Sequence, residues 1–163
     1  MINVAFDLKN QIIADLEYSS NLEKISYENI LIMGMGGSGI AGDVMKILSN
    51  EISDKNIFVQ KDYSIPKQVK KFKPLCLFIS YSGNTEETLS GISDAKRNNF
   101  DWIVISSGGK LIDMANEEGK EFIKIPSGLQ PRAAFGYLTL AVSKIIDIVE
   151  GSNYVSQLND VSS

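Results

Sequence analysis

Short apolar runs alternate with helical stretches along most of the chain. Runs of three to five apolar residues predict buried strands at 30–33, 57–59, 75–79, 102–105 and 122–125. Apolar residues spaced three or four apart predict helices over 4–18, 38–49, 85–98, 110–118 and 133–149. This alternation predicts a three-layer α/β sandwich with a five-stranded parallel sheet. We assign 1–150 to one domain and 151–163 to a C-terminal tail or the start of a linker to a second domain.

The loop after the first predicted strand is rich in glycine. Residues 34–43 read GMGGSGIAGD, at the edge of the sheet where α/β proteins bind ligands. Glycines there let backbone N–H groups, such as that of Gly36, approach a ligand closely. The spacing of Gly34, Gly36 and Gly39 also fits a dinucleotide-binding motif. That motif needs an acidic residue about twenty positions further on, and Asp62, 23 residues after Gly39, does not exclude it. A tight turn without a ligand is the third possibility.

The loop after the third predicted strand is rich in hydroxyl groups. Residues 80–88 read SYSGNTEET, with Ser80, Ser82 and Thr85 just before a predicted helix. Three hydroxyls beside the free N–H groups of a helix N-terminus favour an anion such as the phosphate of a small molecule. Helix capping by Asn84 or Thr85 is the alternative, and it accounts for one hydroxyl only.

The loop before the last predicted helix carries an arginine. Residues 126–132 read PSGLQPR, so Pro131 fits a helix start and Arg132 falls in its first turn. A cation is unfavourable there against the helix dipole, which suggests a bound anion or a functional role. An ordinary ion pair of Arg132 with Glu118 or Glu121 is the alternative.

Composition excludes several kinds of chemistry. The 163 residues contain no histidine and one cysteine, which rules out histidine-based catalytic triads, histidine-ligated zinc and an internal disulfide. A net charge of −4 argues against nucleic-acid binding. No signal peptide or membrane-spanning run is predicted, so we expect a cytoplasmic protein.

The glycine-rich and hydroxyl-rich loops together resemble the sugar isomerase (SIS) domain family, whose members bind phosphosugars in a flavodoxin-like fold. With PRAAFGY at 131–137, the chain resembles the N-terminal half of the bifunctional phosphoglucose/phosphomannose isomerases. The residues that match the family's sugar-phosphate contacts are Gly37, Ser38, Ser80, Ser82 and Thr85. Arg132 matches the arginine that stabilises the enediolate intermediate.

The resemblance implies isomerisation of glucose 6-phosphate or mannose 6-phosphate to fructose 6-phosphate, without cofactor or metal. The resembled enzymes are about twice as long, and their glutamate, histidine and lysine lie in a second SIS domain. This chain alone therefore lacks the expected acid and base residues. A non-catalytic phosphosugar-binding regulatory module is the main alternative, and a dinucleotide-binding domain is the third.

The last predicted helix suggests a partner. Twelve of the seventeen residues at 133–149 are apolar, more than one face of a sheet can cover. We expect a homodimer, or pairing with a second SIS domain, in which Phe135, Leu138, Val142 or Ile146 crosses the interface.

Overall fold

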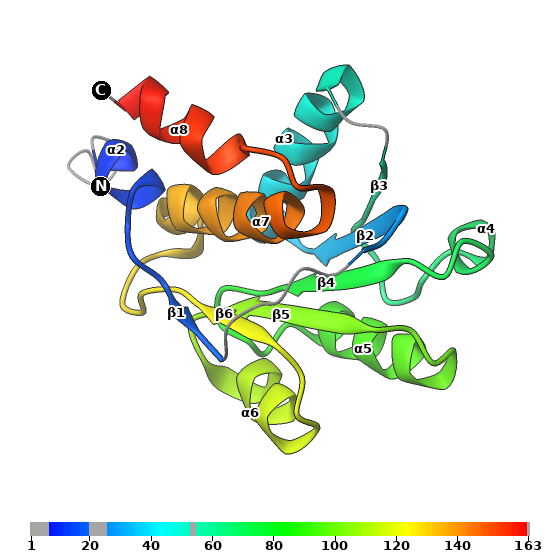
Figure 1. The fold of residues 1–163 in the computed structure, drawn as a ribbon. Helices are drawn as coiled ribbons and strands as arrows, with labels where there is room; N and C mark the ends of the chain where they lie inside the picture. Colours follow the sequence, from blue (N-terminus) through cyan, green and yellow to red (C-terminus); the bar gives the residue numbers. More distant parts are fainter. Residues whose placement is uncertain (1–6, 20–25, 53–54, 163) are drawn as a thin grey trace.

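Six strands form one sheet at the centre of the protein (Figure 1). The computed structural model describes residues 7–19, 26–52 and 55–162. The strands are β1 (Glu17–Tyr18), β2 (Asn29–Gly34), β3 (Asn56–Gln60), β4 (Leu75–Ile79), β5 (Trp102–Ser106) and β6 (Phe122–Lys124). Their order is β1-β6-β5-β4-β2-β3, and all neighbours are parallel except the β1–β6 pair. The predicted α/β sandwich is confirmed.

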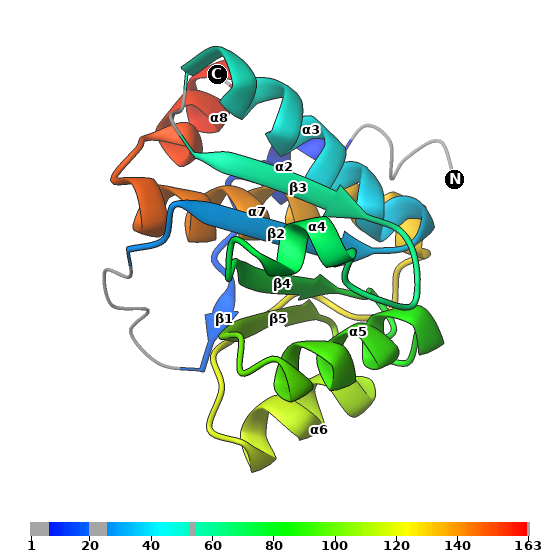
Figure 2. The same cartoon turned by 90° about the vertical axis from the view of Figure 1, so that its right-hand side faces the viewer.

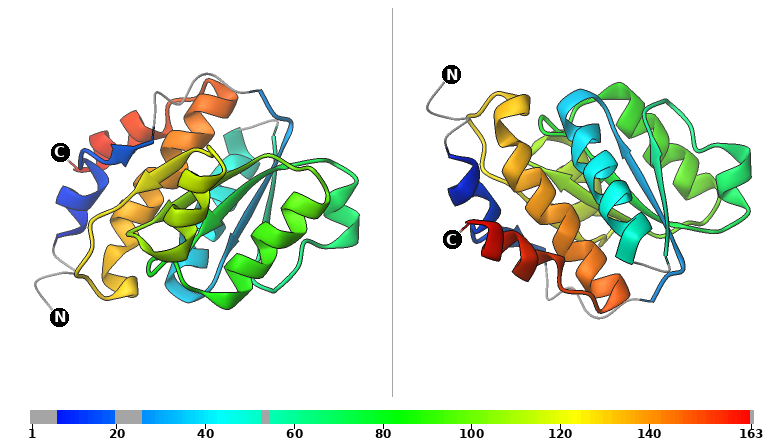
Figure 3. Two further views of the ribbon diagram at one scale, coloured as in Figure 1. Left: turned by 90° about the horizontal axis from the view of Figure 1, so that it is seen from below. Right: turned by 90° about the horizontal axis from the view of Figure 1, so that it is seen from above.

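Helices cover both faces of the sheet. In Figures 1 and 2, α3 (Gly36–Ile52) and α7 (Phe135–Glu150) lie on one face, and α5 (Glu86–Arg97) and α6 (Gly109–Glu117) on the other. The short α4 (Lys67–Lys70) precedes β4. In Figure 3, α2 (Leu8–Ile12) and α8 (Tyr154–Ser162) lie beside α7, with which both are in contact. None of the described helices is long and apolar enough to cross a membrane.

The central strands are buried on both faces. Ile30 and Ile32 of β2 point into the core beneath α3 and α7, whereas Leu31 and Met33 point into the core beneath α5 and α6. Parallel strands covered on both sides read as continuous apolar runs, because alternate side chains enter different cores. This is why the strands were visible in the sequence.

The N-terminal segment differs from its prediction. A helix was expected over 4–18, but α2 ends at Ile12 and the chain continues to β1, a sixth strand that pairs antiparallel with β6. Residues 4–6 of that helix lie outside the described part of the chain. Leu16, within the expected helix, lies outside α2 and is buried in the core. Pairing with the open edge of β6 outweighs the helical spacing of the apolar residues.

The protein's own chain covers three of the four side chains of the last helix that were expected at an interface; Phe135 is half-buried, and the homodimer stays a prediction. Leu138, Val142 and Ile146 are fully buried, because α3, α2 and α8 pack around α7 together with the sheet. These three side chains cannot cross a contact with a partner. Residues 151–163, expected to be a tail or linker, contain α8, whose Tyr154 is buried against α7.

A buried carboxylate ties the loop before α4 to α5. Asp94 accepts hydrogen bonds from the Lys70 ammonium (2.8 Å), the Ile65 N–H (2.9 Å) and the Asn98 amide (3.1 Å). Its side chain is 6% exposed. Burial raises the pKa of Asp94, but the Lys70 hydrogen bond, the Ile65 N–H and the charges of Lys70 and Arg97 lower it by more, so the net shift is downward.

We expect Asp94→Ala to lower the free energy of unfolding by about 2–4 kcal/mol, because Lys70 and the Ile65 N–H lose their common acceptor. A lowered folded-state pKa means that the carboxylate stabilises the fold above its unfolded pKa of about 3.9, and that this contribution is lost as pH falls through the lower folded value. Urea unfolding between pH 2 and 7 measures both effects. Asp113→Ala, at an exposed site on α6, is the control; an equal loss in both variants would contradict the assignment.

Candidate functional site

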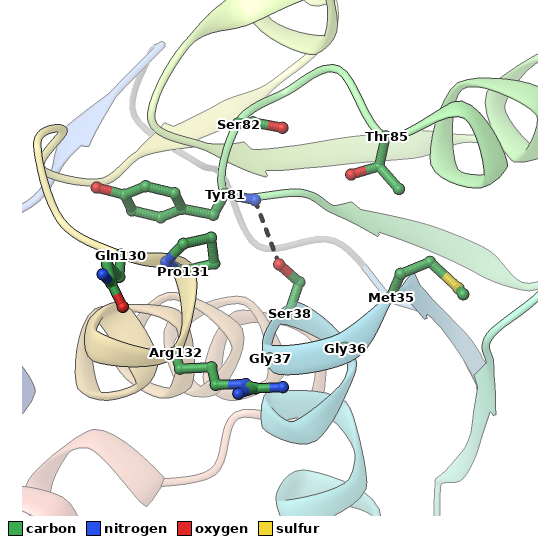
Figure 4. Close-up of a pocket in the computed structure, with 10 residues that line it drawn as sticks. All are labelled: Met35, Gly36, Gly37, Ser38, Tyr81, Ser82, Thr85, Gln130, Pro131 and Arg132. Carbon is green, nitrogen blue, oxygen red and sulfur yellow. Dashed lines mark hydrogen bonds between the residues drawn. The ribbon is translucent and has the colours of Figure 1, made fainter.

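A pocket of about 420 Å³ opens at the carboxyl edge of the sheet (Figure 4). Three loops form it: the one between β2 and α3, the one between β4 and α5, and the turn before α7. It is lined by Met35, Gly36, Gly37, Ser38, Tyr81, Ser82, Thr85, Gln130, Pro131 and Arg132. The structure therefore brings together the three segments singled out in the sequence. The volume suits a small polar metabolite.

The β4–α5 loop rests on the loop that precedes α6. Gly83 has φ +70°, and a Cβ atom there would lie 1.8 Å from the Gly108 carbonyl oxygen. The Asn84 side chain donates to the Ser82 carbonyl (3.0 Å) and accepts the Lys110 N–H (3.2 Å). Ser107 donates its hydroxyl to the Tyr81 carbonyl (2.6 Å). These contacts fix the backbone that presents Ser82 and Thr85.

The three hydroxyls of this loop are placed differently. Ser82 is exposed in the pocket and Thr85 is half-buried in its wall. Ser80 is 1% exposed and is not among the lining residues; its oxygen accepts the Gly83 N–H (3.1 Å) and lies 2.7 Å from the Thr85 hydroxyl oxygen. When Ser80 donates to Thr85, the Thr85 hydroxyl hydrogen is left for a ligand. Ser80 therefore acts on the pocket only indirectly, through its hydrogen bond with the Thr85 hydroxyl.

The first loop is joined to the second by Ser38. The Ser38 hydroxyl oxygen accepts the Tyr81 N–H at 3.2 Å, the dashed line in Figure 4. The Ser38 hydroxyl hydrogen is therefore available to a group in the pocket. Gly37 lies against the turn before α7, since a Cβ atom there would be 3.5 Å from the Arg132 Cα.

Arg132 lies in a 3-10 turn, η1 (Pro131–Ala134), rather than in the first turn of α7 itself. Its side chain is exposed and forms no ion pair with any residue that the structure describes. The two carboxylates offered as alternative partners are engaged elsewhere: Glu118 pairs with Lys96, and Glu121 accepts the Ser19 hydroxyl. Neither carboxylate therefore pairs with the Arg132 guanidinium, and Arg132 lines the pocket.

The arrangement suits an anion. The first N–H groups of α5 have no acceptor within the helix and lie beside Ser82 and Thr85, while Arg132 is the one charged residue among the ten that line the pocket. None of those ten is a carboxylate, a lysine or a histidine, and the hydroxyl of their one tyrosine, Tyr81, is already bonded to the Pro126 carbonyl and the Leu129 N–H. The geometry supports binding and charge stabilisation more than proton transfer.

Three of the lining residues were not expected from the sequence, and two residues considered there lie outside the pocket. Tyr81, Met35 and Gln130 were not predicted, although each adjoins a motif residue that was. Asp62, the acidic residue of the dinucleotide alternative, is exposed and is not among the lining residues. Cys76 is buried in β4, and burial raises its pKa to about 12, which makes it a core residue without thiolate chemistry. Among the described residues, no three acidic, cysteine or histidine side chains gather as a metal site would require.

Comparison with known proteins identifies related chains. The model of the SIS domain family matches residues 25–117, more than half of the chain. A bifunctional phosphoglucose/phosphomannose isomerase of Thermoplasma acidophilum is 42% identical over 158 residues, which cover 93% of this chain and 47% of that protein. A D-glucosamine-6-phosphate 4-epimerase of Sulfolobus acidocaldarius is 36% identical over 141 residues, 86% of this chain and 42% of that protein.

Solved structures agree on the fold. The tagatose-6-phosphate ketose/aldose isomerase of Escherichia coli superposes with a TM-score of 0.63 at 16% identity, over 84% of this chain and 41% of that one. The chain spans less than half the length of the two curated relatives described above.

We expect Gly83→Ala to disrupt the pocket as well as the fold. The positive φ costs about 1–2 kcal/mol for any residue with a Cβ atom, and the clash with the Gly108 carbonyl adds to it. Gly119→Ala is a matched control, because Gly119 has φ +60° with nothing within 4 Å of an added Cβ. Thermal unfolding should show a larger loss for Gly83→Ala, and equal losses would contradict the packing argument.

Proposed function

The chain belongs to the SIS domain family, and on that premise we propose that it is the phosphosugar-binding half of an aldose–ketose isomerase. The proposed reaction interconverts glucose 6-phosphate or mannose 6-phosphate with fructose 6-phosphate. One observation carries the proposal: three separate loops place hydroxyl donors, a helix N-terminus and an arginine that has no ion-pair partner among the described residues around one pocket. The 42% identity to a bifunctional phosphoglucose/phosphomannose isomerase supports the choice of reaction.

In this proposal the phosphate binds between the first turns of α3 and α5. Ser82 and Thr85 donate hydroxyl hydrogens from one side and Ser38 donates from the other, while Gly36 and Gly37 offer N–H groups of the first turn of α3, which have no acceptor within the helix. Ser80 holds Thr85 in place from beneath. Neutral donors suit a phosphate that must be released with the product.

Arg132 stabilises the charge that develops at the other end of the sugar. Isomerisation removes a proton from the carbon next to the carbonyl, forms an enediolate and returns a proton to the neighbouring carbon. The enediolate oxygen becomes negative only during the reaction, so a guanidinium placed beside it favours the intermediate over the substrate. Having no ion-pair partner among the described residues, Arg132 is not neutralised in advance.

A second SIS-type domain, in the same polypeptide or in another copy of the chain, is proposed to supply the acid and base groups. The pocket lining offers none, and the related isomerase is about twice as long as the matched segment. The interface cannot use the buried side chains of α7. The outer side of α3 is the better candidate, since Ile40 (46% exposed) and Ile47 (64%) lie there on the helix that begins at the pocket. Sedimentation velocity at micromolar concentration distinguishes self-pairing from a monomer.

A non-catalytic phosphosugar-binding module is the second candidate function. The absence of any carboxylate, lysine or histidine from the ten lining residues is the observation that favours it. The SIS family match favours a sugar phosphate over the dinucleotide considered from the glycine spacing.

We expect Ser82→Ala to weaken fructose 6-phosphate binding about 5- to 30-fold, because a hydrogen bond to a charged acceptor contributes roughly 1–2 kcal/mol. Isothermal titration calorimetry measures the affinity. Ser93→Ala is the matched control, since Ser93 lies exposed on α5 and its hydroxyl donates only to the Leu89 carbonyl of the same helix. Unchanged affinity in Ser82→Ala would remove Ser82 from the site.

We expect the 163-residue chain alone to bind fructose 6-phosphate without converting it at an enzymatic rate. Each general acid–base step contributes on the order of 10²–10⁴-fold, and the groups for these steps are absent from the pocket lining. An assay that follows formation of glucose 6-phosphate and mannose 6-phosphate tests this. Turnover near about 10 s⁻¹ would show that carboxylates of this chain suffice.

A further inference from the structure

A glutamine outside the pocket holds the turn that carries Arg132. Gln11 belongs to α2 and is 1% exposed. Its side-chain N–H donates to the Ala133 carbonyl at 2.8 Å, and its side-chain oxygen accepts the Gly136 N–H at 3.0 Å. Both halves of the amide are therefore used on backbone groups at the junction of η1 and α7.

The contact between Gln11 and the start of α7 requires a glycine at position 136. A Cβ atom at Gly136 would lie 2.6 Å from the Gln11 Cβ and 2.9 Å from the Leu8 Cδ1. Gly136 thus lets α2 approach the start of α7 closely enough for the two hydrogen bonds. A buried amide without partners would be costly, so the pair of bonds specifies one position of the turn relative to α2.

Tyr81 holds the loop that precedes this turn. Its hydroxyl accepts the Leu129 N–H (2.7 Å) and donates to the Pro126 carbonyl (3.2 Å). Arg132 lies between these anchors and the ones made by Gln11. The Arg132 side chain is exposed and has no ion-pair partner among the described residues. The direction of the guanidinium therefore depends on the backbone of the turn.

We propose that Gln11 is a positioning residue for Arg132: its side-chain amide fixes the 3-10 turn so that the guanidinium meets the developing negative charge of the bound sugar. The inference rests on the proposed function. Gln11 belongs to the N-terminal segment, which lies outside the residues matched by the SIS family model, and the proposal adds this segment to the functional site.

The test compares two ligands by calorimetry. D-Arabinonate 5-phosphate carries a planar carboxylate where the enediolate would form, and fructose 6-phosphate carries a neutral carbonyl. We expect Gln11→Leu to weaken arabinonate 5-phosphate binding about 10-fold while fructose 6-phosphate binding stays within about twofold, because only the first ligand needs an aimed guanidinium. Gln68→Leu, an exposed glutamine on α4, is the control and should change neither affinity.

A double-mutant cycle separates positioning from simple destabilisation. In an Arg132→Ala background, Gln11→Leu should have no further effect on arabinonate 5-phosphate, because its effect passes through Arg132. Equal weakening with and without Arg132, or equal weakening of both ligands, would overturn the inference.

Gln11→Glu keeps the test decisive if the leucine variant does not fold. A protonated glutamic acid can donate to Ala133 and accept from Gly136, as the amide does, whereas the ionised form cannot donate. Burial raises the pKa of a carboxyl group placed there above its usual value of about 4.3, so the variant is compared with the unmodified protein at each pH from 5 to 8. At pH 8, where the carboxyl group is ionised, the preference of Gln11→Glu for arabinonate 5-phosphate over fructose 6-phosphate should fall below that of the unmodified protein. A preference equal to that of the unmodified protein at pH 8 would overturn the inference.

Failure of the proposed function gives a different result. If the unmodified protein binds neither ligand, the phosphosugar assignment fails and the role of Gln11 fails with it. If the unmodified protein prefers arabinonate 5-phosphate and Gln11→Leu keeps that preference, only the positioning role is wrong.

Discussion

The pairing of β2 with β4 is the constraint on which the site depends. The two strands are parallel neighbours, with Gly34 opposite Ile79 at their carboxyl ends. The helices that follow them leave toward opposite faces, α3 to one core and α5 to the other. A gap between the two loops follows necessarily from this topology, and it is where sheets of this class bind ligands. The Ser38–Tyr81 hydrogen bond spans the gap and fixes its width.

Most of the fold could be predicted from the sequence because it is determined locally. Buried parallel strands are continuous apolar runs, and the glycine-rich and hydroxyl-rich loops stand directly after two of them. The 75–79 strand was predicted with its observed bounds. Arg132 was singled out by its unfavourable place in the first turn of the predicted helix, and it does line the pocket.

What could not be predicted depends on contacts between distant segments. The expected N-terminal helix is cut short by pairing with β6, more than 100 residues away, and the sheet gains a strand. The apolar surface of α7 suggested a partner, but α2 and α8 cover it. Ser80 was grouped with Ser82 and Thr85 by spacing, and only the three-dimensional arrangement shows that its hydroxyl supports Thr85. Gln11 gave no signal, since a single glutamine in an apolar pattern looks like a solvent-facing position.

The elements that cover α7 bear on where this domain can be divided. The family match ends at residue 117, before β6, η1 and α7, and begins after α2 and β1. A protein cut to the matched residues would keep α3 but would expose the parts of α3 and β5 that α7 now covers. It would also lack Arg132 while retaining the glycine-rich and hydroxyl-rich loops. The residues that the family model matches and the residues that build the pocket are therefore different lengths of chain, and the part that the family model leaves out carries the arginine.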